Sequence, residues 1–477
     1  MWATLNFYFF KDPTFFYLSA RLIFGVFAGT YSIWLLYRMI RERYSEKVAL
    51  LSAFFLAVNF LHVRDSHYVY ADIPLLAVLI AAFSCVIDIA QGRKRGWQVH
   101  LHSGALIGLA VAVKYNGVVL VLPYLLASLW SEDRKKILLY GSLAAAAALL
   151  LYTLANPFTW LDFNFFWKEI SMQSQAAGKT GAFHHLAYSL QGAVGPGLFI
   201  AGLLGIGAGI REGQKHRGIL IFFIVVYFLL LVFKSQPYDR YVLPLIPFFL
   251  FFAADGLSLA AVRIFPERWE KKGLALLGIL FALPPLGKSL LSDHLFLQKD
   301  VRDVAKEWVE TTIAPGSKLA LEWEFFMPRL RFTRKQLEEK LEMIPKAPYF
   351  SKAQERRIQF LLADPVPQRY SLYFLSEPSE GERFLFGTPA VPFKLSELKR
   401  RGIEYVFVAR VQEEHVHSEF YKELREKAEP VKRFSPYRNP EREYPFDRQP
   451  LTGGPFLWKE LISRERNGQP IEVYRLR

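Results

Sequence analysis

The dominant pattern in this sequence is an alternation of long apolar stretches with short polar linkers. The stretches cover residues 15–37, 48–61, 73–90, 101–113, 118–130, 137–155, 193–210, 218–233, 241–262 and 273–291. A transmembrane helix needs about 20 apolar residues to cross about 30 Å of hydrocarbon, and most stretches approach that length. The pattern therefore predicts a polytopic α-helical membrane protein.

After residue 291 the long apolar stretches stop and a different pattern begins. Helical spacing of apolar positions predicts helices over 300–312 and 395–401. Short apolar runs predict strands over 318–321 and 402–409, with a last edge strand over 471–474. Helices alternating with strands are typical of a small α/β domain. We expect a membrane domain over residues 1–291 and a C-terminal soluble α/β domain over 292–477.

Composition narrows the functional class. The net charge of +15 could indicate a nucleic-acid binder, but the sequence shows no basic patch interleaved with stacking aromatics, so we expect no nucleic acid as partner. The single cysteine, Cys85, lies within an apolar stretch and excludes a disulfide framework or a cysteine metal site. A large domain outside the cytoplasm without disulfides favours a prokaryotic inner membrane protein.

The basic residues are unevenly distributed between alternate linkers. One set of linkers carries most of them, namely Arg38, Arg41, Arg43, Lys47, Arg93, Lys94, Arg95, Arg134, Lys135, Lys136, Arg211, Lys215, Arg217, Arg263, Arg268, Lys271 and Lys272. The other set carries only Arg64, Lys114, Lys168, Lys179, Lys234 and Arg240. Because cytoplasmic linkers are enriched in Lys and Arg, the first set is predicted to be cytoplasmic. The second set and the C-terminal domain are then extracytoplasmic.

A cluster of ionisable residues separates the second and third apolar stretches. Arg64, Asp65, His67 and Asp72 lie within nine residues. If this segment were helical, Asp65, Tyr68 and Asp72 would share one face; if it is a loop, they crowd one turn at the membrane surface. Carboxylates, a guanidinium and an imidazole together suit phosphate binding and hydroxyl activation. The simpler alternative is a solvated loop between two membrane helices.

Three short motifs give this pattern a family resemblance. His62-Val-Arg-Asp-Ser-His-Tyr-Val-Tyr-Ala-Asp-Ile-Pro74 resembles the loop after the third membrane helix of the dolichyl-phosphate-mannose protein mannosyltransferases. That group includes other transferases that use polyprenyl-phosphate sugars. Lys114-Tyr-Asn-Gly117 and Arg240-Tyr-Val-Leu-Pro-Leu-Ile-Pro247 follow in the order and at about the distances that the family shows. The resemblance implies a GT-C fold.

The resemblance also implies a reaction and roles for individual residues. A sugar is transferred, with inversion, from a polyprenyl-phosphate carrier to a hydroxyl of a protein, lipid or glycan. Asp72 corresponds to an acidic site residue, and Asp65 could support it. The departing phosphate requires cationic side chains or a divalent metal, Mg²⁺ or Mn²⁺. The predicted substrate-binding residues are Arg64, His67, Tyr68, Lys114, Tyr115, Asn116, Arg240 and Tyr241.

One part of the family pattern is missing from this sequence. The family carries a membrane helix and a loop with an acidic pair before the position of residue 15. Asp12 is the only acidic residue there, and its place beside Pro13 fits the linker into the first stretch. A misplaced start, a fragment or a different site would each explain the difference.

The linker over 156–191 is rich in aromatic residues between Phe158 and Trp167. Aromatics at this density are typical of the headgroup region, where a helix could lie flat as an anchor. The functional alternative is a lip over a lipid-linked substrate. His184 and His185 are adjacent and have no partner at metal-ligand spacing, so we do not expect them to bind a metal.

Two other functions compete with the transferase. Asp88 and Asp255 within apolar stretches would suit a transporter or a flippase for lipid-linked sugars. The missing acidic pair would suit a non-catalytic membrane partner. Which sugar and which acceptor are used cannot be read from the sequence.

Overall fold

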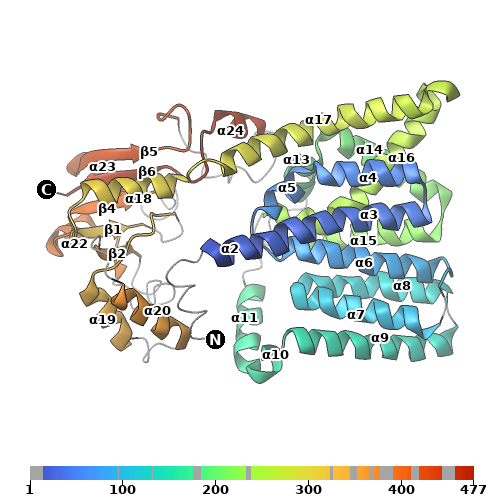
Figure 1. Ribbon diagram of the computed structural model, residues 1–477, viewed down its shortest axis with the longest axis horizontal. Helices are drawn as coiled ribbons and strands as arrows, with labels where there is room; N and C mark the ends of the chain where they lie inside the picture. The colour runs from blue at the N-terminus through green and yellow to red at the C-terminus, as the bar shows by residue number, and fades with distance from the viewer. Residues whose placement is uncertain are drawn as a thin grey trace. The chain divides into compact units, whose positions relative to one another are not determined.

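The structure is a computed structural model of the chain. It describes residues 14–94, 96–131, 133–175, 184–232, 238–322, 326–343, 352–364, 369–376, 390–409, 418–442 and 457–476. Asp12, Arg95, Lys179 and Lys234 lie outside these ranges. The described residues form two compact units, one containing residues 17–292 and the other most of the residues from 293 onward (Figure 1).

The first unit is built from helices that lie largely side by side (Figure 1). They are α2 (Thr14–Ala20), η1 (Arg21–Phe27), α3 (Ala28–Arg43), α4 (Glu46–Ala57), α5 (Phe60–Ser66), α6 (Asp72–Ala90), α7 (Trp97–Val113), η2 (Tyr115–Leu120), α8 (Val121–Ser131), α9 (Arg134–Ala155), α10 (Phe158–Leu161), α11 (Phe163–Gln175), η3 (His185–Leu190), α13 (Gln191–Val194), α14 (Pro196–Glu212), α15 (Lys215–Val232), η4 (Asp239–Leu245), α16 (Ile246–Ile264), η5 (Glu267–Trp269) and α17 (Glu270–Phe296).

These helices confirm the prediction of a polytopic α-helical membrane protein. Each predicted apolar stretch lies mainly in one helix or in two or three consecutive ones, and the first stretch covers α2, η1 and part of α3. Within the described ranges, six helices are long and apolar enough to cross a membrane, and two bent helix pairs would raise the number to eight. The fourth and fifth stretches form the shorter helices α7 and α8, and Lys114 lies at the break between α7 and η2.

Small residues allow two of these helices to approach closely. A Cβ atom added at Gly104 or Gly108 of α7 would overlap the backbone of Ala144 or Ala148 of α9. Close backbone approach through Gly and Ala is a common way to pack helices where water does not drive association. This packing holds α7, and therefore the break at Lys114, against α9.

Polar side chains bond to backbone groups at the bends of the two broken helices. Asn59, between α4 and α5, accepts a hydrogen bond from the His62 amide at 3.1 Å and donates one to the Ala193 carbonyl at 3.1 Å. Lys288 of α17 donates to the Gly192 carbonyl at 2.8 Å, and Ser289 donates to the Val58 carbonyl at 3.0 Å. Backbone groups that a bend releases need such partners in an apolar environment.

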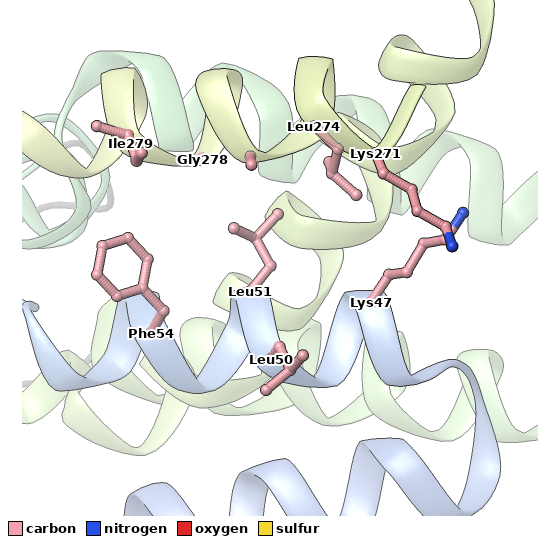
Figure 2. A pocket seen from close by; sticks show the side chains of 9 residues that line it. Lys47, Leu50, Leu51, Phe54, Lys271, Leu274, Gly278 and Ile279 are labelled. Atoms are coloured by element: carbon pink, nitrogen blue, oxygen red, sulfur yellow. The ribbon is translucent and has the colours of Figure 1, made fainter. Parts of the chain in front are cut away.

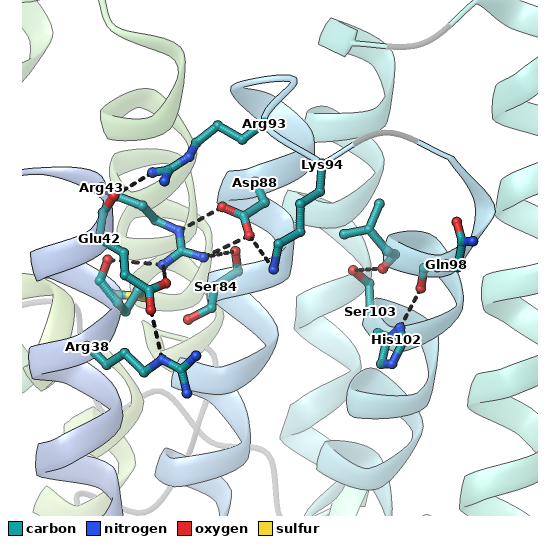
Figure 3. Close-up of polar contacts among 12 residues, drawn as sticks. Arg38, Glu42, Arg43, Ser84, Asp88, Arg93, Lys94, Gln98, His102 and Ser103 are labelled. Carbon is teal, nitrogen blue, oxygen red and sulfur yellow. Dashed lines mark hydrogen bonds and ion pairs between the residues drawn. The ribbon is translucent and has the colours of Figure 1, made fainter.

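The two acidic residues that could have indicated a transporter are both in ion pairs. Figure 3 shows Asp88 with Arg43, whose guanidinium lies 2.8 Å from Asp88 Oδ2, and with Lys94. Both the Arg43 and the Asp88 side chain are 3% exposed. Asp255 pairs with Arg217 at 2.5 Å. These pairs join residues of the basic linkers to the ends of apolar helices, so both acids have a structural role.

The second unit contains a six-stranded sheet with helices. The strand order is β3-β2-β1-β4-β6-β5. The strands are β1 (Lys318–Leu321), β2 (Ser371–Leu375), β3 (Ala390–Val391), β4 (Tyr405–Val408), β5 (Glu429–Phe434) and β6 (Ile471–Arg475). The helices are α18 (Val301–Thr312), α19 (Arg334–Met343), α20 (Lys352–Ala363), α22 (Leu395–Arg400), α23 (Ser418–Lys427) and α24 (Leu457–Ser463).

This sheet confirms the predicted α/β fold and corrects one detail. β1 pairs in parallel with both β2 and β4, and buried apolar residues from the strands form clusters on the two faces of the sheet. The prediction that residues 471–474 form an edge strand is wrong. β6 pairs antiparallel with β4 on one side and with β5 on the other, because β5 adds a strand at the edge.

Candidate functional site

The central contact of the candidate site is an ion pair between two of the sequence motifs. Asp72 is the first residue of α6, and its side chain is buried. Lys114 has an extended backbone between α7 and η2, and its amide donates the last hydrogen bond of α7 to the Ala110 carbonyl. Its ammonium lies 2.6 Å from Asp72 Oδ1. The predicted carboxylate and one predicted phosphate-binding cation therefore meet.

Gly117 makes this position of Lys114 possible. The Gly117 amide donates to the Lys114 carbonyl at 2.8 Å, which closes the turn. A Cβ atom at Gly117 would lie 2.6 Å from the Ala110 carbonyl oxygen of α7. Only a residue without a side chain fits so close to another backbone. The close contact with α7 therefore explains why the Lys114-Tyr-Asn-Gly117 motif has glycine at position 117.

The third motif places a second cation beside this pair. The ring of Tyr241, in η4, has the Lys114 ammonium 5.4 Å and the Arg240 guanidinium carbon 5.8 Å from its centre. Arg240 also lies over Tyr238 at 4.3 Å and over Tyr70 at 4.9 Å. Cations at these distances are attracted to the faces of aromatic rings. Tyr241 is therefore the shared neighbour of the two cations.

A second charged group lies on α5 and η4. Arg64 donates to Asp65 at 2.8 Å, and Asp65 is buried. The buried carboxylate of Asp239 attracts Arg64 and also the buried ammonium of Lys288. Asp239 directly precedes Arg240 in η4, and Arg240 lies over the same Tyr241 ring as Lys114. The second charged group is therefore next to the Asp72–Lys114 pair.

The remaining predicted residues surround these charges less directly. His67 Nδ1 bonds to the Val63 carbonyl at 2.9 Å, and the ring of Tyr68 lies 5.2 Å from that of Tyr70. The alternative of one continuous helix is wrong, since α5 ends at Ser66 and α6 begins at Asp72. Asp65, Tyr68 and Asp72 do not share a helix face, because the turn over 67–71 reorients the chain.

Tyr115 and Asn116 connect the site to two other helices. Asn116 donates to the hydroxyl of the buried Tyr227 in α15 at 3.3 Å. The exposed ring of Tyr115 lies 5.9 Å from that of Phe166 in α11. The aromatic part of the linker lies in α10 and α11, and the ring contact brings α11 close to the residue that follows Lys114.

Several residues of the site were missed from the sequence. Lys288 had a detectable signal, since it is the one charged residue in the apolar stretch 273–291. Asp239 directly precedes the predicted site residue Arg240, but no motif residue marks it. Tyr70 and Tyr227 gave no signal, because their roles depend on contacts between segments distant in sequence.

The described residues do not fit a bound metal ion. Among them no group of three or more His, Cys, Asp or Glu side chains is placed to hold one. His185 is buried and bonds through Nδ1 to Ser189 at 3.1 Å, while the His184 ring stacks on Tyr188. Asp72 is already bonded to Lys114.

Comparison with known proteins agrees with the motifs. Residues 16–160 match the profile of the family described as dolichyl-phosphate-mannose-protein mannosyltransferase. This range contains Asp72 and Lys114 and confirms the resemblance. No curated protein sequence matches the chain.

Some solved structures are similar to this chain at low identity. ArnT from Cupriavidus metallidurans in the apo state has 13% identity and a TM-score of 0.47, with 86% of this chain and 81% of that chain covered. The same protein bound to undecaprenyl phosphate has 14% identity, a TM-score of 0.44 and coverages of 81% and 78%. Arabinofuranosyltransferase AftD from Mycobacteria has 14% identity and a TM-score of 0.38, with coverages of 95% and 35%.

Proposed function

We propose that this membrane protein, a glycosyltransferase similar to the dolichyl-phosphate-mannose-protein mannosyltransferases, transfers a sugar from a polyprenyl-phosphate carrier to an acceptor hydroxyl. The transfer inverts the anomeric carbon and takes place on the membrane face opposite the basic linkers. The observation that carries the proposal is the Asp72–Lys114 contact of 2.6 Å, with Arg240 beside the same Tyr241 ring.

The two cations are suited to a phosphate. Arg240 offers a planar guanidinium for bidentate contact, and Lys114 offers a compact charge. A donor phosphate between them competes with Asp72 for the Lys114 ammonium. As the bond between the anomeric carbon and the phosphate oxygen breaks, negative charge grows on that oxygen, and both cations stabilise it.

Asp72 is suited to act on the acceptor. When the donor phosphate draws Lys114 away, the carboxylate can accept the proton of the acceptor hydroxyl. The hydroxyl oxygen then attacks the anomeric carbon opposite the departing phosphate. A new glycosidic bond forms, the old bond to phosphate breaks, and the polyprenyl phosphate leaves. A single displacement of this kind inverts the configuration.

No observation favours the transporter as a second function. Its supporting residues, Asp88 and Asp255, are bonded to Arg43 and Arg217. The predicted site residues with a charge instead lie on α5, at the start of α6, at the α7–η2 break and on η4.

The test is sugar transfer from a panel of labelled polyprenyl-phosphate sugars in membranes that contain the full chain. Asp72→Asn is expected to lower transfer at least about 100-fold, because a positioned general base contributes about 10² to 10⁴. Asp133→Asn is the matched control, since the Asp133 side chain is 83% exposed. Transfer by none of the donors from an inserted, folded protein would overturn the proposal, as would full activity of Asp72→Asn.

A further inference from the structure

A cavity separate from the candidate site lies in the helical unit, between α4 and α17. It has a volume of about 370 Å³ and is lined by Lys47, Leu50, Leu51, Phe54, Lys271, Leu274, Ala275, Gly278 and Ile279 (Figure 2). All the lining residues other than the two lysines are apolar. None of them belongs to the candidate active site.

The apolar part of the cavity is an open groove along α17. From Lys271 to Ile279 the helix rises about 12 Å, at about 1.5 Å per residue. Gly278 leaves room there, since a Cβ atom would lie 2.6 Å from Leu51 Cδ1. Leu50, Phe54 and Ile279 are exposed at 57%, 39% and 55%. The groove therefore opens toward the surroundings of the helices rather than into the protein.

The two lysines lie together at one end of the groove. Figure 2 shows the side chains of Lys47 and Lys271 reaching toward each other there. Lys47 bonds to Glu270 at 2.7 Å. Lys271 makes no hydrogen bond or ion pair with any residue in the described ranges. The ammonium of Lys271 is thus available to a ligand at this end.

The neighbouring sequence adds positive charge and an interfacial anchor. Lys272 follows Lys271, and its ammonium lies 4.6 Å from the centre of the exposed Trp269 ring. Tryptophan beside lysine is typical of the headgroup level of a bilayer. Lys47 and Lys271 both belong to the basic linkers, so the charged end of the groove lies where anionic headgroups meet the protein.

We propose that this groove binds an anionic phospholipid of the leaflet that faces the basic linkers. The acyl chain lies along Leu51, Leu274 and Gly278, and the phosphate lies at Lys271 and Lys47. The apolar groove is complementary to an acyl chain, and its net positive end is complementary to an anionic headgroup. An anionic phospholipid has both parts in one molecule. A zwitterionic lipid would leave that net charge unmatched.

The test compares binding of phosphatidylglycerol and phosphatidylcholine to the full chain in mild detergent. Native mass spectrometry counts bound lipid, and thermal unfolding reports the rise in Tm on titration. Lys271→Gln is expected to weaken phosphatidylglycerol binding about fivefold, the equivalent of about 1 kcal/mol per basic residue near the surface. Gly278→Leu is expected to abolish the preference, because the added side chain fills the groove.

Matched controls make the same chemical changes elsewhere. Gly141→Leu adds the same side chain to α9, where a Cβ atom meets nothing within 4 Å. Lys135→Gln removes an exposed charge from another basic linker. Neither change is expected to alter binding. If Gly278→Leu does not insert, Ile279→Trp narrows the groove from its open side and takes its place.

The proposal requires phosphatidylglycerol to bind more tightly than phosphatidylcholine. It also requires the two groove variants to lose phosphatidylglycerol binding as expected, Lys271→Gln by about fivefold and Gly278→Leu to the level of phosphatidylcholine. Equal binding of the two lipids would overturn it. A loss in only one of the two groove variants, or an equal loss in the controls, would do so as well. These measurements do not depend on transferase activity.

Discussion

The Lys114 ammonium and the Asp72 carboxylate lie 2.6 Å apart, although 42 residues separate them in the sequence. Asp72 is buried, and Lys114 reaches it only because the chain breaks between α7 and η2. A buried carboxylate needs a partner, and in this protein that partner is also a candidate phosphate ligand. The contact therefore links the stability of the site to its chemistry.

Lys114→Met is expected to lower kcat/KM for the lipid-linked donor by about tenfold to 100-fold. A hydrogen bond to a charged group contributes about 1.5–3 kcal/mol, and each 1.36 kcal/mol corresponds to about tenfold in rate. Steady-state transfer assays give this value directly. The double variant with Asp72→Asn should lose less than the product of the two single losses, because the residues act as a unit. Strictly independent effects would contradict the pairing.

Arg240→Lys is expected to raise KM for the donor about tenfold, because Lys keeps the charge but loses the planar, bidentate guanidinium. It also loses the contacts with Tyr70 and Tyr238. The assay varies donor concentration at saturating acceptor. Arg268→Lys, in a basic linker, provides the control. An unchanged KM in Arg240→Lys would show that the Arg240 guanidinium does not bind the donor phosphate.

Gly117→Ala is expected to impair both stability and transfer. The new methyl group would meet the Ala110 carbonyl of α7, so the turn that carries Lys114 must move. Overpacking of this kind costs about 1–3 kcal/mol. Thermal unfolding in detergent and transfer per folded molecule measure the two effects. Gly141→Ala, in open space on α9, should change neither. Normal transfer by Gly117→Ala would show that this turn does not position Lys114.

Asp88→Asn is expected to destabilise the protein by about 3 kcal/mol, because it removes the buried carboxylate charge that faces the buried Arg43 guanidinium and leaves Arg43 with the more exposed Glu42. Asp133→Asn breaks an exposed pair with Lys136 and should cost less than about 1 kcal/mol. Thermal unfolding compares the two. Transfer per folded molecule should be unchanged in Asp88→Asn. A selective loss of activity without loss of stability would give Asp88 a functional role.

The α/β unit contains a carboxyl group whose titration is predicted to affect stability. Hydrogen bonds from Arg400 and Arg401 lower the pKa of Glu397 from 4.5 to about 2. Because the folded pKa is the lower one, ionised Glu397 stabilises the fold above pH 4.5. This contribution is lost as the pH falls from 4.5 toward about 2.

Replacement of Glu397 by Gln should therefore flatten the fall of Tm with pH below 4.5. The measurement is Tm as a function of pH for the full chain. Glu419→Gln is the control, since Glu419 is exposed and has no hydrogen bond or ion pair within the described ranges. An identical pH profile for Glu397→Gln and the unchanged chain would contradict the assignment.

The helices of the membrane unit could be predicted because each depends on a local property. An apolar stretch of sufficient length forms a helix in hydrocarbon whatever its neighbours are. The strands of the second unit depend on pairing instead. Residues 471–474 were correctly predicted as a strand, but their interior place required β5, which the sequence pattern did not reveal.

The part of the site that depends on local sequence could also be predicted. The motifs identified Asp72, Lys114 and Arg240 from their own residues. The contact of Asn116 with Tyr227 depends on how α15 packs, and the attraction of Lys288 to Asp239 depends on the position of α17. Neither position can be derived from local sequence.

The bonds at the two helix bends have a mechanical consequence. Asn59 holds the bend after α4 to the Ala193 carbonyl, while Lys288 and Ser289 hold the Gly192 and Val58 carbonyls to one turn of α17. The bends therefore cannot hinge independently. A displacement of α5, which carries Arg64 and Asp65, would pull on α13 and α17 together. If an acceptor enters by moving α5, then α5, α13 and α17 are expected to move together.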